Sequence, residues 1–221
     1  MTSTTQKAYI GMGMEGSIAR WYEKTTRRDL DAFRTLAVRL RDLLPSGGDI
    51  LEVAPGPGFL SVELARNPPL HVTALEISKT FVELARKNAA EARVPVNIVQ
   101  GNASAMPFAD SSFDLIVCRA AFKNFAEPAQ ALEQMRRVLR PGGRALIIDL
   151  RRDVSMQQIN RYVDSLHLGF FSRWNTSLTF RFMLLKRAYT AAEFEKLLQG
   201  IGFAETEIVS NDIGMEILMV K

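Results

Sequence analysis

Apolar and polar positions alternate along this chain in a pattern that predicts short buried strands with amphipathic helices between most of them. Five apolar runs have the length of a strand, and helical segments at this spacing favour a parallel, doubly wound sheet. The runs span residues 49–53, 70–75, 94–99, 113–118 and 144–150. A run such as 115–118 is apolar at every position, which is typical of a strand buried on both faces.

Helical spacing of apolar residues occurs before these runs and between them. Residues 15–44 predict one or two helices, and we interpret residues 1–44 as an N-terminal helical lid. Further helices are predicted over residues 59–66, 78–92 and 128–139. Thr190 begins a capping box that predicts another helix, and two closing strands follow at 203–209 and 214–220.

Residues 153–188 break the alternation, because they are rich in Phe, Leu, Met and Trp without the turns that separate strands from helices. We expect a helical insertion that forms a pocket wall for an aromatic or hydrophobic small molecule. An ordinary helical subdomain packed on the sheet and an oligomer contact are the alternatives. His167 lies in this segment, and its side chain is suited either to proton transfer or to an exposed surface position.

Composition narrows the class of protein. The chain has 221 residues, of which 47% are hydrophobic and 24% charged, as in ordinary globular domains. One cysteine and two histidines argue against a zinc cluster, so we expect no metal. No apolar run is long enough for a membrane span and the first residues are polar, so the expected location is the cytoplasm.

Candidate chemistry begins at residues 51–58, where a strand leads into a glycine-rich turn and then a helix. Glycines let the backbone approach a ligand closely, and a helix N-terminus offers amide donors. Glu76 follows the second strand, where an acid can accept both hydroxyls of a ribose. A tight turn and a solvated glutamate would be the structural alternatives, but the combination favours a nucleoside-containing ligand.

Two more segments complete a pattern. Residues 101–108 follow the third strand, and residues 136–144, which include Arg-Pro-Gly-Gly, precede the fifth. In this order the four segments resemble the class I S-adenosylmethionine-dependent methyltransferases. The resemblance implies a Rossmann-like doubly wound sheet of seven strands, with the last antiparallel and a helical insertion between strands five and six. The methyltransferase domain would span residues 45–221.

The resemblance also implies a cofactor site for S-adenosylmethionine. The turn would hold the methionine part, the acid the ribose, and the residues after the third strand the adenine. By position these residues are Glu52, Ala54, Gly56, Gly58, Glu76, Ile77, Asn102 and Ala103. The usual first glycine is Ala54 here, which requires a φ that is not strongly positive, and the usual acid is Asn102, whose oxygen can accept from adenine.

The stretch Arg119–Phe125 is similar to the ubiquinone/menaquinone C-methyltransferase group, in which this loop touches both cofactor and acceptor. The similarity makes Arg119 a cofactor-site candidate and Asn124 an acceptor-site candidate. Lys123 and Asn124 could instead form an exposed helix end. In related enzymes an aromatic residue of the N-terminal helix closes over the cofactor, which suggests this role for Tyr22, while we expect Trp21 to pack in the core.

Methyl transfer from a sulfonium is an in-line displacement in which proximity supplies much of the rate, and a base is needed only for a tightly held proton. The catalytic candidates are His167, Asn124 and Tyr189. We therefore predict methyl transfer to a small aromatic or hydrophobic acceptor, by a monomer or a homodimer.

Three other functions remain open at this point. A dinucleotide-binding oxidoreductase would need a third glycine where Ser61 stands. An RNA methyltransferase could use arginines between residues 136 and 152 on phosphates, but no RNA-binding module accompanies them, and nucleic acid is disfavoured. The third is a catalytically silent module that only binds S-adenosylmethionine.

Overall fold

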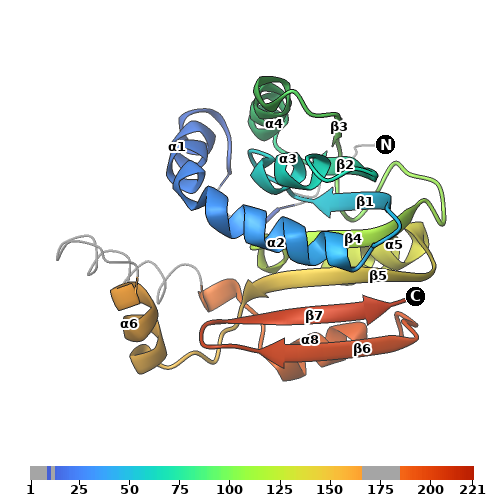
Figure 1. Ribbon diagram of the computed structural model, residues 1–221. Helices are drawn as coiled ribbons and strands as arrows, with labels where there is room; N and C mark the ends of the chain where they lie inside the picture. Colours follow the sequence, from blue (N-terminus) through green and yellow to red (C-terminus); the bar gives the residue numbers. More distant parts are fainter. Residues whose placement is uncertain (1–8, 11–12, 166–184) are drawn as a thin grey trace, which may run out of the picture.

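The computed structural model describes residues 9–10, 13–165 and 185–221. In this part of the chain seven strands form one sheet in the order β3-β2-β1-β4-β5-β7-β6 (Figure 1). The first five strands are parallel, and β7 runs antiparallel to β5 and β6. The strands are β1 Gly48–Val53, β2 Leu70–Glu76, β3 Val96–Gln100, β4 Phe113–Arg119, β5 Leu139–Leu150, β6 Glu205–Ser210 and β7 Gly214–Val220. The predicted fold class is confirmed, including its antiparallel last strand.

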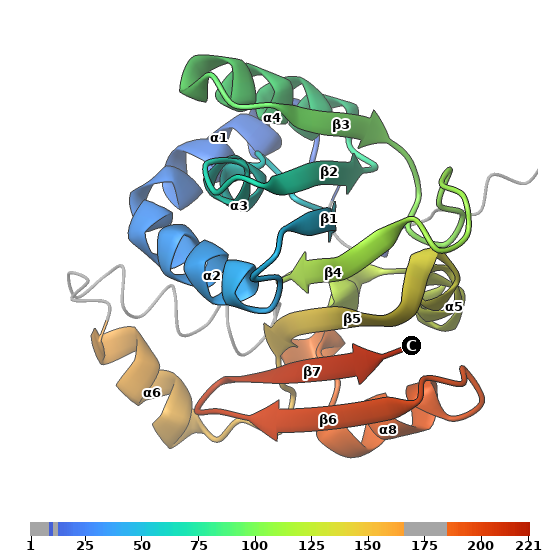
Figure 2. The same cartoon turned by 45° about the vertical axis from the view of Figure 1, so that its right-hand side comes forward.

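Helices cover both faces of the sheet, with α2 on one side and α5 and α8 on the other (Figures 1 and 2). The helices are α1 Gly16–Thr26, α2 Leu30–Asp42, α3 Phe59–Ala65, α4 Lys79–Ala92, α5 Pro128–Val138, α6 Met156–Ser165 and α8 Ala191–Leu198, with short 3₁₀ turns η1 Arg27–Asp29, η2 Phe122–Asn124 and η4 Leu185–Arg187. The predicted caps are present: Ser78 accepts from the N–H of Phe81, and Thr190 and Glu193 form the capping box.

Successive residues of the central strands pack into the core on opposite faces of the sheet. On β1, Ile50 packs into the cluster under α2 and α3, while Leu51 packs into the cluster under α5 and α8. On β4, Leu115 and Ile116 divide in the same way. Because all four are fully buried, the apolar runs reflect burial on both faces rather than an amphipathic sheet.

The start of β5 differs from the sequence prediction. The helix expected to reach Leu139 ends at Val138, and β5 already begins at Leu139 instead of Arg144. The pairing of β5 with β4 shifts register between Phe113 and Leu115, so the Pro-Gly-Gly segment is an irregularity within a long strand. A β-carbon on Gly143 would lie 2.9 Å from the carbonyl oxygen of Arg140, which explains why glycine occupies this position.

The N-terminal segment and the insertion are described in part. Residues 15–44 form helices as predicted, and α2 buries Phe33, Ala37 and Leu40 in the core. The insertion begins with α6 and ends with η4, while His167 lies outside the described residues. Among the helices that the structure describes, none is long and apolar enough to cross a membrane.

Candidate functional site

The glycine-rich turn between β1 and α3 has three residues with positive φ, namely Ala54, Gly56 and Gly58, at +56°, +59° and +76°. The expectation that Ala54 avoids a positive φ is therefore wrong. A left-handed alanine costs about 1–2 kcal/mol, and here the surrounding structure holds it there. The N–H of Ala54 donates to the carbonyl oxygen of Leu75 at 2.8 Å, which ties the turn to the adjacent strand β2.

Gly58 combines a left-handed backbone with a close approach. It is the N-cap residue of α3, and a β-carbon placed on it would lie 2.9 Å from the β-carbon of Ala85 on α4. Gly56 lies in a more open position, where a β-carbon would meet Tyr22 and Phe81 at ordinary contact distance, 3.9 Å. Gly56 therefore leaves the turn accessible, and Gly58 lets helices α3 and α4 pack closely.

Glu76 ends β2 with its carboxylate held by two backbone N–H groups. Oε2 accepts from Gly56 at 2.9 Å, and Oε1 accepts from Ser78 at 2.9 Å. Burial raises the pKa of this carboxyl, while these hydrogen bonds lower it. Each oxygen keeps a further lone pair, so the carboxylate can accept the two hydroxyls of a ribose without giving up either contact.

The residues predicted to hold the adenine, Asn102 and Ala103, follow β3, while Ile77 was predicted together with Glu76 after β2. Ile77 is 38% exposed, as much as Ile18, and it offers an apolar surface directly after Glu76. The side-chain oxygen of Asn102 accepts from the N–H of Ser104 at 3.0 Å, so that the adjacent turn fixes its direction. Ala103 packs against the core below. These positions fit an adenine, and their role stays a prediction.

Glu52 is a buried carboxyl directly before the turn. Burial raises its pKa to about 7, and a hydrogen bond from the hydroxyl of Ser61 and the charge of Arg119 lower it in part. The guanidinium of Arg119 lies 4.7 Å from the ring centre of Phe33. The two predicted cofactor residues Glu52 and Arg119 are thus electrostatically coupled at the ends of neighbouring strands.

Aromatic side chains cover the turn from the N-terminal side. Tyr22 of α1 packs edge-on against Phe81, with ring centres 5.7 Å apart, and its ring lies next to Gly56. This position suits the predicted closing role. The expectation that Trp21 packs in the core is wrong, since 66% of its surface is exposed. On helix α1 the adjacent Tyr22 faces α4 and the glycine-rich turn, so Trp21 points to solvent.

Tyr9 lies close to the predicted site, and the sequence did not indicate this position. It forms an antiparallel bridge with Phe125, and the N–H of Ile10 donates to the carbonyl of Asn124 at 3.0 Å. Burial raises the pKa of the Tyr9 phenol, and the charges of Arg187, Glu76 and Asp149 also act on it. The phenol therefore lies in electrostatic range of both the predicted ribose site and the end of β5.

Lys123 and Asp149 form a buried ion pair at the ends of β4 and β5. The Nζ of Lys123 lies 2.7 Å from Oδ1 of Asp149, and the two side chains are only 5% and 3% exposed. Lys123 Nζ also donates to the carbonyl of Ala120, which itself has a φ of +58°. The alternative of an exposed helix end is thus wrong for Lys123. Asn124 is half-buried, and its predicted acceptor contact stays untested.

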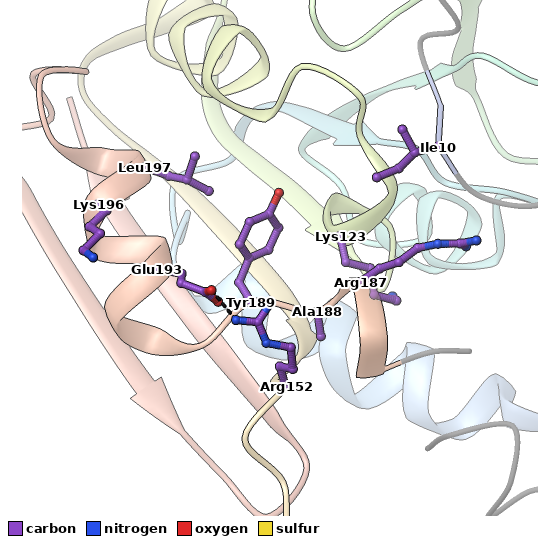
Figure 3. A pocket seen from close by; sticks show the side chains of 9 residues that line it. All are labelled: Ile10, Lys123, Arg152, Arg187, Ala188, Tyr189, Glu193, Lys196 and Leu197. Atoms are coloured by element: carbon purple, nitrogen blue, oxygen red, sulfur yellow. Dashed lines mark hydrogen bonds and ion pairs between the residues drawn. The ribbon is translucent and has the colours of Figure 1, made fainter. Parts of the chain in front are cut away.

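A pocket of about 360 Å³ opens beside this ion pair (Figure 3). Tyr189 stands in it between Leu197 on α8 and the side formed by Lys123, Arg187 and Ile10. Burial raises the pKa of the Tyr189 phenol, so its hydroxyl stays protonated at neutral pH and can donate a hydrogen bond. The catalytic role predicted for Tyr189 remains a prediction.

In the part of the chain that the structure describes, no cluster of His, Cys, Asp or Glu could hold a metal ion.

Comparison with known proteins agrees with this geometry. A family model described as a methyltransferase domain matches residues 51–147. Demethylmenaquinone methyltransferase of Chlorobaculum parvum is 30% identical over 77% of this chain and 72% of its own length. The enzyme of the same name from Deinococcus radiodurans is 35% identical over 45% of this chain and 42% of its own length. A putative S-adenosylmethionine-dependent methyltransferase structure from Methanococcus maripaludis superimposes with a TM-score of 0.72 at 24% identity, covering 100% and 97% of the two chains, which shows the shared fold.

The chain belongs to the class I S-adenosylmethionine-dependent methyltransferases. Within this family it is related to the ubiquinone/menaquinone C-methyltransferases. S-adenosylmethionine is accordingly its cofactor. The residues present suit that molecule, because Glu76 has free acceptor capacity, the turn at Gly56 is open and Ile77 is exposed.

Proposed function

We propose that this enzyme transfers a methyl group to a small aromatic acceptor held in the pocket beside Tyr189. The observation that carries the proposal is the position of this pocket. It lies next to Lys123, at the same carboxyl edge of the sheet as Glu76 and the glycine-rich turn. Ligands of open α/β sheets bind at this edge, so acceptor and cofactor can meet there.

The relatives' names support an aromatic acceptor. Two of them are named after demethylmenaquinone, a ring compound that receives a methyl group. In the present chain Ile10, Tyr189 and Leu197 give the pocket apolar walls of the kind that a ring prefers. We extend to this chain the aromatic class of acceptor.

The chemistry asks little of a base. When bound, S-adenosylmethionine would supply a methyl group on a positively charged sulfur; the carbon–sulfur bond would break with its electron pair on sulfur, the acceptor atom would bond to the methyl carbon, and the proton that the acceptor loses would pass to solvent. Tyr9 and Tyr22 cover the site and limit water, and Tyr189 can orient the acceptor through its hydroxyl. Asp149 accepts from the backbone N–H of Lys123 at Oδ2 and from the Lys123 ammonium group at Oδ1. In this account the carboxylate therefore positions Lys123 and does not act as a base. Proximity and orientation supply the rate in this account.

Two of the arginines that raised RNA as an alternative, Arg137 and Arg140, are engaged within the protein. Arg140 pairs with Asp49 and Asp114, and Arg137 pairs with Asp110 and donates to the carbonyl of Phe108. Side chains engaged in this way serve packing between elements, and this disfavours a phosphate-binding surface formed by these arginines.

The experiment is a transfer assay with the radiolabelled methyl group of S-adenosylmethionine. Substituted hydroquinones, catechols and phenols are offered as acceptors, and total RNA is offered separately. We expect label in a small aromatic product. Label in RNA would contradict the proposal. Binding of S-adenosylhomocysteine without any transfer would instead identify a silent cofactor-binding module.

A further inference from the structure

The acceptor pocket is lined by more positive charges than the neighbouring carboxylates neutralise. Four cationic side chains and one acidic side chain line it: Lys123, Arg152, Arg187, Lys196 and Glu193. Two of the cations have partners, since Asp149 pairs with Lys123 and Glu193 pairs with Arg152. Among the described residues Arg187 and Lys196 have no ion-pair partner, so the pocket keeps two positive charges.

These two charges lie on opposite sides of Tyr189. Figure 3 shows Arg187 next to Lys123 and below Ile10, whereas Lys196 lies with Leu197 on α8. Arg187 ends η4 and comes two residues before Tyr189, so the same short segment supplies a cation and an aromatic ring to the pocket. Its charge also lowers the pKa of the Tyr9 phenol, against the effect of burial.

A guanidinium in such a position has a specific use. Arg187 and Lys196 are both exposed, so water screens their mutual repulsion, and each remains free to attract an anion to the pocket. Arginine binds a carboxylate or a phosphate with two parallel hydrogen bonds. An uncharged quinone ring would leave this capacity unused.

We propose that the methyl acceptor carries an anionic group, a carboxylate or a phosphate, that Arg187 binds while the acceptor ring packs against Tyr189 and Leu197. This inference rests on the proposed function and specifies its substrate class. Lys196, at the other side of the pocket, strengthens the same preference through its charge.

The test uses acceptors from the small-molecule filtrate of a bacterial lysate, separated on an anion-exchange resin at neutral pH. The flow-through and the salt eluate are each incubated with the enzyme and radiolabelled S-adenosylmethionine. We expect labelled product from the eluate, and at least a tenfold loss of kcat/KM with Arg187→Ala. Lys186→Ala is the matched control, because Lys186 is an exposed cation of the same short helix and does not line the pocket. Both variants should bind S-adenosylhomocysteine as the wild type does.

Each other outcome has a defined meaning. Label only from the flow-through, or an unchanged kcat/KM in Arg187→Ala, would overturn the anionic acceptor and leave methyl transfer intact. No label from either fraction, with S-adenosylhomocysteine still bound, would overturn the proposed function and this inference with it. Phosphatase treatment of an active eluate separates the two anions, since it abolishes a phosphate acceptor and spares a carboxylate.

Discussion

The Oε2 atom of Glu76 accepts a hydrogen bond from the backbone N–H of Gly56 at 2.9 Å. This contact joins the end of β2 to the turn after β1, the two elements predicted to hold the cofactor. The second oxygen accepts from Ser78, so the carboxylate is fixed before a ligand arrives. A group that is already ordered loses less entropy on binding, which favours affinity.

Replacing Ala54 by glycine should stabilise the protein or leave its stability unchanged. Ala54 has a φ of +56°, and glycine removes a strain of about 1–2 kcal/mol while adding about 0.4–1 kcal/mol of unfolded-state entropy. Ala32→Gly, in the exposed face of α2, should instead cost about 1 kcal/mol. Urea unfolding checks both, and equal destabilisation by the two substitutions would argue against strain at Ala54.

Gly58→Ala should destabilise the fold more than Gly142→Ala. Their φ values are nearly equal, +76° and +75°, but a β-carbon at Gly58 meets Ala85 at 2.9 Å whereas nothing lies within 4 Å of one at Gly142. The difference isolates the overpacking cost, about 1–3 kcal/mol. Thermal unfolding of the two variants measures it. If both variants lose the same stability, the close contact between α3 and α4 does not add to the cost of the β-carbon at Gly58.

Lys123→Met should cost about 3–5 kcal/mol, because it leaves Asp149 buried without its partner. The double variant Lys123→Met/Asp149→Asn should recover much of this loss. Lys87→Met removes an exposed pair with Glu91 and should cost less than about 1 kcal/mol. Equilibrium unfolding of the three variants tests this ranking, which fails if the single variant at Lys123 behaves like the surface control.

Stability should depend on pH through Glu52. Burial raises its pKa to about 7 from an ordinary value of 4.5, so the folded chain keeps a proton that the unfolded chain has lost between these values. Stability therefore falls as pH rises through this window, by roughly 3 kcal/mol in all at about 1.4 kcal/mol per pH unit. Glu52→Gln removes this contribution. The unfolding free energy of the wild type minus that of the variant should decrease from pH 4.5 to pH 8, and a constant or increasing difference would refute the assignment.

The sequence predicted most of the fold because the relevant signals are local. The apolar runs located the strands, and Gly56 and Glu76 follow strand ends that any parallel sheet brings to one edge. The start of β5 was predicted five residues late, because Pro141 and two glycines are typical of a turn and only pairing with β4 makes them part of a strand.

The remaining site residues depend on partners distant in the chain. Lys123 is buried because Asp149, 26 residues further on, lies on the neighbouring strand. Tyr9 reaches the site only by pairing with Phe125, and no local pattern around it indicates this bridge. Ala54, whose φ is positive, likewise donates to Leu75 on β2, a partner that the local sequence does not indicate.

The most direct test of the account is calorimetry with S-adenosylhomocysteine on the wild type, Glu76→Gln and Glu83→Gln. Glu76 is buried at the proposed ribose site, and Glu83 is an exposed glutamate of α4. A hydrogen bond to a charged group contributes about 1.5–3 kcal/mol, so we predict that Glu76→Gln raises the Kd at least about tenfold and Glu83→Gln leaves it unchanged. A wild type that does not bind, or a Glu76→Gln variant that binds equally well, would contradict the cofactor site described for this chain.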